Sequence, residues 1–161
     1  KATFANDNKI NVAVVLLRRI SNFTDFNRLE HDERVHLYYT NNRTELQKAD
    51  IIILPGSKNT IADIIELRRN GVAAEISKLA RAGKTVIGIC GGYQMMGQRI
   101  EDPNGIESNV EAVPGLNILQ TTTVLEDKKQ TIRTILKITK HFARVTKFTW
   151  EKHLLPLTRI R

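Results

Sequence analysis

The chain alternates between short apolar segments rich in Val and Ile and longer segments whose apolar residues recur at helical spacing. The apolar segments are residues 10–17, 34–39, 50–54 and 84–89. Runs of Val and Ile without regular polar alternation are typical of strands buried on both faces, as in a parallel sheet. We therefore expect four strands, of which the second is the most amphipathic.

Two helices are expected between the third and fourth strands, one from an N-cap at Thr60 to a stop at Asn70-Gly71 and one from Val72 to a stop at Ala82-Gly83. Thr60 and Asp63 fit a capping box, in which an N-cap hydroxyl is followed three residues later by a carboxylate. The two segments are followed by Asn-Gly and Ala-Gly, which are helix stops. Alternating strands and helices predict right-handed crossovers. The expected fold class is α/β, with a mostly parallel sheet and helices on both faces.

The composition suits one soluble domain. The 161 residues are 41% apolar and 26% charged, and no run of 18 apolar residues suggests a membrane span. The first residues show neither a secretory leader nor an initiator Met, so we expect a piece of a longer protein. A single Cys excludes an internal disulfide, makes a structural metal site unexpected and favours a cytoplasmic location.

The net charge of +8 is confined to one end of the chain. Residues 127–161 hold 10 Lys and Arg against two Asp and Glu, and the preceding 126 residues hold 15 of each sign. A protein that binds polyanions usually carries basic residues on its folded face. We therefore expect no nucleic-acid partner, a domain over residues 1–126 and a basic tail over 127–161. Within that tail, residues 131–142 fit either a basic amphipathic helix or an extended hairpin.

The segment V-I-G-I-C-G-G-Y-Q-M-M, residues 86–96, has the pattern of a nucleophile elbow. A buried strand leads directly into Cys90, and Gly88, Gly91 and Gly92 give the room that a sharp strand-to-helix turn needs. The helix N-terminus favours a thiolate at Cys90, and the N–H of Gly91 would face an oxyanion on an attacked carbonyl. The alternative is a small buried core cysteine.

A second segment, L-P-G-S-K-N-T, also follows a strand and is expected to neighbour Cys90 at the same sheet edge. Its Pro-Gly turn could offer the N–H of Gly56 as a second oxyanion donor, or could simply end the strand. The stretch from Ala82 to Thr85 has the end of a phosphate-binding loop, but it follows a helix and opens a strand, so we reject that function. No local motif marks any of the four histidines as a base, namely His31, His36, His141 or His153.

Four motifs carry a family resemblance. They are R-I-S-N-F-T-D-F (residues 19–26), L-P-G-S-K-N-T-I-A-D (54–63), G-I-C-G-G-Y-Q-M (88–95) and V-P-G-L (113–116). In this order and spacing, the chain from about residue 10 to residue 126 resembles the class I glutamine amidotransferase domain of the cobyric acid synthase family. The resemblance implies a flavodoxin-like three-layer sandwich.

The resemblance also implies an activity and its residues. Cys90 would attack the side-chain amide of glutamine and release ammonia, Gly56 and Gly91 would form the oxyanion pair, and Gln94 would line the substrate pocket. The family uses ammonia, ATP and magnesium to amidate adenosylcobyrinic acid a,c-diamide in cobalamin biosynthesis. ATP, magnesium and the corrinoid would bind an N-terminal domain missing here, so no cofactor or metal is expected in this domain.

The end of the chain departs from the family pattern after V-P-G-L. The nearest match to the family's next motif places His153 at a histidine that is not catalytic, and the segment with the catalytic histidine would lie beyond Arg161. We therefore expect the isolated chain to hydrolyse glutamine at or near background. Two other functions stay open: an amidotransferase domain of another amide-forming synthase, such as the peptidoglycan-amidating type, and a non-catalytic binding module with a basic tail.

Overall fold

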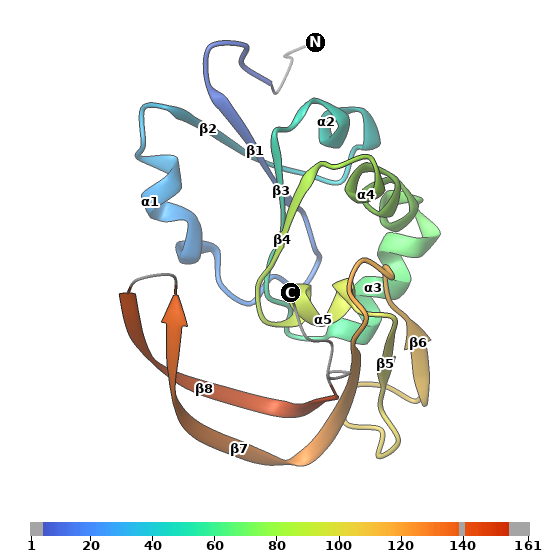
Figure 1. Cartoon of the computed structure of the whole chain (residues 1–161). Helices are drawn as coiled ribbons and strands as arrows, with labels where there is room; N and C mark the ends of the chain where they lie inside the picture. The colour runs from blue at the N-terminus through green and yellow to red at the C-terminus, as the bar shows by residue number, and fades with distance from the viewer. Residues whose placement is uncertain (1–4, 139–140, 155–161) are drawn as a thin grey trace.

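Four parallel strands form the central sheet, in the order β2-β1-β3-β4 (Figure 1). The computed structural model describes residues 5–138 and 141–154. The strands are β1 (Ile10–Val15), β2 (Val35–Thr40), β3 (Ile51–Leu54) and β4 (Thr85–Gly88). All four expected strands are therefore confirmed, with ends that differ by at most two residues from those predicted.

The two faces of the sheet are buried by different layers. Val12 and Val14 of β1 pack with Phe26 on one face, whereas Ala13 and Val15 belong to the larger cluster that faces the long helices. This alternation follows from the two-residue period of a strand. Figure 1 shows α1 on one side of the sheet and α3 and α4 on the other, which confirms the three-layer α/β architecture.

The helices are η1 (Phe23–Phe26, a 3₁₀ turn), α1 (Asn27–Glu30), α2 (Arg43–Lys48), α3 (Thr60–Arg69), α4 (Val72–Arg81) and α5 (Gly91–Met96). The expected helices α3 and α4 are confirmed, and Gly71 between them has φ 79°, the left-handed conformation that a helix stop favours. The short η1, α1 and α2 were not expected, because none is long enough to show a helical period.

The expected capping box at the start of α3 is wrong. The N-cap is Asn59, whose side chain accepts a hydrogen bond from the Ala62 N–H at 2.8 Å. Asn is as good an N-cap as Thr, and it stands one residue earlier. Thr60 is instead the first helical residue, and the carboxylate of Asp63 is free to bond elsewhere.

A second sheet, in the order β6-β5-β7-β8, follows α5. Its strands are β5 (Arg99–Glu101), β6 (Ala112–Pro114), β7 (Thr122–Ile138) and β8 (His141–Leu154). The β7–β8 pair is antiparallel, so the extended hairpin, not the helix, describes the backbone of residues 131–138 and 141–142; residues 139–140 lie outside the described part. β7 crosses residue 126, and the domain boundary at that residue stays a prediction. Expectations about residues 1–4 and 155–161 lie outside the described residues.

No helix in the described part of the chain combines the length and apolar character needed to cross a membrane.

Candidate functional site

Two turns meet where β3 and β4 end. Leu54 and Gly88 are paired at the carboxyl ends of these parallel strands, and the Ile89 N–H donates to the Leu54 carbonyl at 2.9 Å. A Cβ placed on Gly56 would lie 3.6 Å from the Cβ of Cys90. The Pro-Gly turn is therefore the immediate neighbour of Cys90, as the sequence predicts.

Cys90 has an unusual backbone conformation. Its φ is 50° and its ψ is −116°, and a positive φ is rare for a residue with a side chain. Strained conformations of this kind persist where the surrounding structure enforces them, and they cluster at functional sites. The side chain is exposed, so the interpretation of Cys90 as a buried core cysteine is wrong.

Close backbone packing explains two glycines of the elbow. A Cβ on Gly92 would lie 2.0 Å from the Leu54 carbonyl oxygen, because α5 begins directly against the end of β3. A Cβ on Gly88 would lie 2.6 Å from the Cα of Tyr93. Both contacts involve backbone atoms, so any larger residue would displace the elbow that presents Cys90.

Cys90 opens onto a cavity of about 450 Å³, which is within the size range of small-molecule sites. The lining comes from the Pro-Gly turn, α3, the elbow, the loop after β5 and β7: Ser57, Lys58, Thr60, Cys90, Gly91, Gln94, Ile106, Glu107 and Leu125. Three of the four residues singled out from the sequence thus share one cavity, and the fourth, Gly56, adjoins Cys90. A larger cavity lies between α4 and β6, away from the thiol.

Gln94 and the two candidate oxyanion donors have distinct surroundings. Gln94 is 2% exposed, and its Oε1 accepts a hydrogen bond from the Thr60 hydroxyl at 3.2 Å. Within the described residues, no protein acceptor takes the N–H of Gly56 or of Gly91. These two N–H groups are therefore available to an oxygen atom of a bound molecule beside Cys90.

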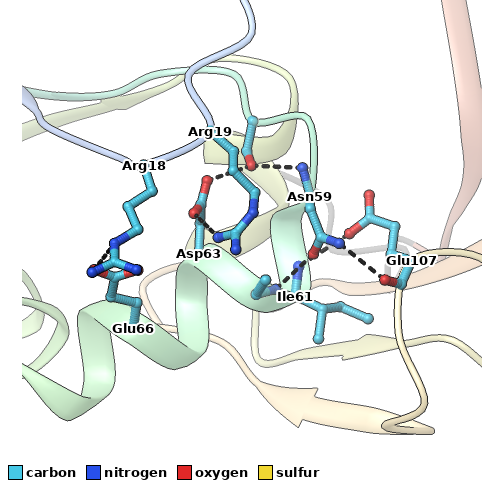
Figure 2. A network of polar contacts seen from close by, with 9 residues as sticks. Arg18, Arg19, Asn59, Ile61, Asp63, Glu66 and Glu107 are labelled. Carbon is cyan, nitrogen blue, oxygen red and sulfur yellow. Dashed lines mark hydrogen bonds and ion pairs between the residues drawn. The ribbon is translucent and has the colours of Figure 1, made fainter.

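Glu107 is a site residue that the sequence analysis missed. Its Oε2 accepts from the Ile61 N–H at 3.1 Å, and its carbonyl accepts from the Asn59 amide at 2.9 Å (Figure 2). Burial raises the pKa of the Glu107 carboxyl. The loop is shaped by Asp102, which is 1% exposed and accepts three backbone N–H bonds from residues 106–108. No sequence motif marks this loop, so only the tertiary structure reveals it.

Two other possible sites are not supported. The Lys84 ammonium donates to the carbonyls of Gln47 and Ala49, and the segment enters a strand, so it does not form a phosphate-binding loop. No group of three His, Cys, Asp or Glu side chains converges as a metal site in the described part of the chain. Among the described side chains that line the cavity there is no histidine.

Comparisons with known proteins agree with this architecture. The chain is 61% identical over 127 residues to a cobyric acid synthase of Phocaeicola vulgatus, covering 79% of this chain and 26% of the relative. It is 39% identical over 154 residues to a cobyric acid synthase of Clostridium botulinum, covering 96% of this chain and 30% of the relative. The chain thus spans between a quarter and a third of the length of these relatives.

Two solved structures share the fold. One is a glutamine amidotransferase with a TM-score of 0.59 and 18% identity, covering 85% of this chain and 70% of that structure. The other is PurLQS from Thermotoga maritima, with a TM-score of 0.61 and 17% identity, covering 91% of this chain and 69% of that structure. The model of the CobB/CobQ-like glutamine amidotransferase domain matches residues 11–153. The chain therefore belongs to the family of CobB/CobQ-like glutamine amidotransferase domains.

Proposed function

We propose that this chain is the ammonia-supplying part of a cobyric acid synthase, with Cys90 as the nucleophile that attacks glutamine. The observation that carries the proposal is the exposed thiol on a strained elbow, which opens on a cavity beside the Gly56 turn. This arrangement brings a nucleophile and two unused N–H donors together at the carboxyl edge of a parallel sheet.

The chemistry follows from these groups. The Cys90 sulfur forms a bond to the side-chain amide carbon of glutamine, and the carbonyl electron pair moves onto the oxygen. The N–H groups of Gly56 and Gly91 stabilise that oxyanion. When the oxyanion collapses, the C–N bond breaks, and the departing nitrogen leaves as ammonia after taking up one proton, which balances the proton that the Cys90 thiol lost on becoming a thiolate. Water then cleaves the glutamyl thioester, which gives glutamate and restores the thiol.

The cavity carries one cationic and one anionic side chain beside the thiol. Lys58 and Glu107 both line it, and a free amino acid presents one carboxylate and one ammonium group. We assign the α-ammonium of glutamine to Glu107 and its α-carboxylate to Lys58, because opposite charges in a partly desolvated site attract strongly. Gln94 forms the inner wall, where it supports the side-chain amide of the substrate.

Glutamine binding tests this assignment. Glu107→Gln keeps an acceptor for the Ile61 N–H but removes the charge, so we expect binding to weaken about tenfold, as for the loss of one charged hydrogen bond. Burial raises the pKa of Glu107 above its ordinary value. Binding should therefore weaken as the pH falls through that raised pKa, because a protonated carboxyl cannot pair with the ammonium.

Isothermal titration with L-glutamine at several pH values measures both effects. Glu111→Gln is the matched control, because Glu111 is exposed and lies outside the cavity lining. The control should bind like the unmodified chain. Equal affinities for the Glu107→Gln and Glu111→Gln variants would remove Glu107 from the glutamine site.

With no histidine among the described residues that line the cavity, we expect ammonia release by the isolated chain to stay near background.

The remaining steps belong to the whole synthase. We propose that the ammonia amidates peripheral carboxylates of a corrinoid, adenosylcobyrinic acid a,c-diamide, in the cytoplasm. ATP with magnesium would activate those carboxylates on a separate domain. The described residues of this chain do not fit ATP, since Lys84 is held by backbone carbonyls and no other segment has the spacing of a phosphate-binding loop. We therefore assign no step in the described part of this chain to the nucleotide.

A further inference from the structure

A buried carboxylate lies directly behind the Gly56 turn. Asp63, in the first turn of α3, is 1% exposed. Its Oδ1 accepts from the Arg19 guanidinium at 3.0 Å, and its Oδ2 accepts from the Ser57 hydroxyl at 2.6 Å (Figure 2). Both carboxylate oxygens are thus occupied, one by the segment after β1 and the other by the residue that follows Gly56.

The same two segments are also joined through their backbones. The Ser21 N–H donates to the Gly56 carbonyl at 3.0 Å, and the Lys58 N–H donates to the Arg19 carbonyl at 2.8 Å. Ile20 and Ser57 form an isolated antiparallel bridge between these bonds. The turn that carries Gly56 is therefore held by hydrogen bonds to the segment after β1 and, through the Ser57 hydroxyl, by a hydrogen bond to Asp63.

The Ser57 side chain connects Asp63 to the turn that carries Gly56. Its hydroxyl donates to Asp63 and accepts from the Asn59 N–H at 3.0 Å, so the side chain cannot rotate without losing two hydrogen bonds. The Ser57 backbone nitrogen also lies close to the elbow, since a Cβ on Gly91 would be 3.2 Å from it. A shift of Ser57 would thus move the Gly56 N–H relative to Cys90.

We propose that Asp63 is a positioning residue for the oxyanion turn. Through Ser57, it holds the Gly56 N–H where the oxyanion forms, and Arg19 neutralises its buried charge. This inference rests on the proposed function, because it assumes that a tetrahedral oxyanion forms on a substrate attacked by Cys90. Donor placement matters, since loss of one oxyanion donor costs about 10²–10³ in rate and small misplacements already cost part of that factor.

The test compares two reactions of the same thiol. The γ-(p-nitrophenyl) ester of L-glutamate reacts through a tetrahedral oxyanion: an S–C bond forms, the C–O bond to the aryl group breaks, and p-nitrophenolate leaves with the electron pair. Iodoacetamide reacts by direct displacement: an S–C bond forms, the C–I bond breaks, and iodide leaves. Only the first reaction uses the oxyanion donors, so the ratio of the two rates reports their placement.

In the full chain, Asp63→Asn should lower the ester reaction at least about tenfold and leave the iodoacetamide reaction within about twofold. The matched control is Glu66→Gln. Glu66 lies on the same helix and pairs with Arg18 at 2.9 Å, but it has no hydrogen bond to the Gly56 turn (Figure 2). The control should react with both reagents like the unmodified chain.

Ser57→Ala supplies a second, independent variant that leaves the Arg19–Asp63 pair intact. It should show the same selective loss of the ester reaction. Adding Asp63→Asn to it should slow that reaction little further, because both changes break the same hydrogen bond between Ser57 and Asp63. Ester rates equal to those of the unmodified chain in Asp63→Asn or Ser57→Ala would overturn this inference and leave the proposed function standing. An unmodified chain that shows no ester reaction at Cys90 would overturn the proposed function together with it.

Discussion

Cys90→Ala is expected to abolish the stoichiometric release of p-nitrophenolate from the γ-(p-nitrophenyl) ester of L-glutamate. The unmodified chain should release about one equivalent in a burst, since one exposed thiol opens on the cavity. The aryl leaving group departs without a proton, so the reaction does not need an acid at the leaving group. The burst therefore tests the nucleophile apart from the rest of the mechanism.

Absorbance at the p-nitrophenolate band measures the burst, and the Cys90→Ala chain supplies the blank for spontaneous loss of the ester. Mass spectrometry of the quenched unmodified chain should find a glutamyl group on the peptide that contains Cys90. A burst of the same size in Cys90→Ala would show that another group reacts and would remove Cys90 as the nucleophile.

Gly56→Val has the second largest expected effect. A Cβ at this position would lie 2.3 Å from the Ser21 hydroxyl oxygen and 3.6 Å from the Cβ of Cys90. The hydroxyl can rotate away from a single methyl group, but branched carbons would have to fit between Ser21 and Cys90 and would displace the turn. We expect the ester reaction to slow by about 10²–10³, the effect of losing one oxyanion donor.

Gly56→Ala is the matched control for this variant, because its Cβ requires only a rotation at Ser21. It should keep most of the ester reaction, and the iodoacetamide reaction should stay near its original rate in both variants. Stopped-flow absorbance gives the ester rate. If Gly56→Val reacts with the ester as fast as Gly56→Ala, the N–H of Gly56 does not contribute to the site.

The central sheet was predictable because each strand carries a strong local signal. The apolar runs Val12–Val15 in β1 and Ile51–Leu54 in β3 are incompatible with an exposed surface, and the glycines after α3 and α4 mark real helix ends. The capping box failed because Asn59 and Thr60 are both suitable N-cap residues, and the sequence does not show which one is used. In the second sheet, β7 and β8 form the extended hairpin that was one of the two alternatives for residues 131–142, whereas the pairings of β5 with β6 and β7 join segments that no local pattern matches.

The candidate site could likewise be predicted only in part. Cys90 and Gly56 could be singled out as candidates because a nucleophile elbow and a Pro-Gly turn at strand ends are local patterns. Glu107 and Asp63 were missed as site residues because their roles arise from contacts across the fold. Glu107 reaches α3 from the loop after β5, and Asp63 bonds to residues 44 positions before it and six positions before it. Charged residues of this kind look like ordinary surface positions in a sequence.

Labelling of the native chain with 6-diazo-5-oxo-L-norleucine, a glutamine analogue, tests the central claim most directly. The diazo carbon takes up a proton from water, the Cys90 thiolate forms an S–C bond to that carbon, and dinitrogen leaves with the electron pair of the C–N bond. The stable S–C bond remains for peptide mass spectrometry. We predict one adduct per chain, on the peptide that contains Cys90, with formation slowed by excess L-glutamine and unaffected by excess L-alanine. A native chain that gains no adduct, and reacts at Cys90 only after unfolding, would contradict the account.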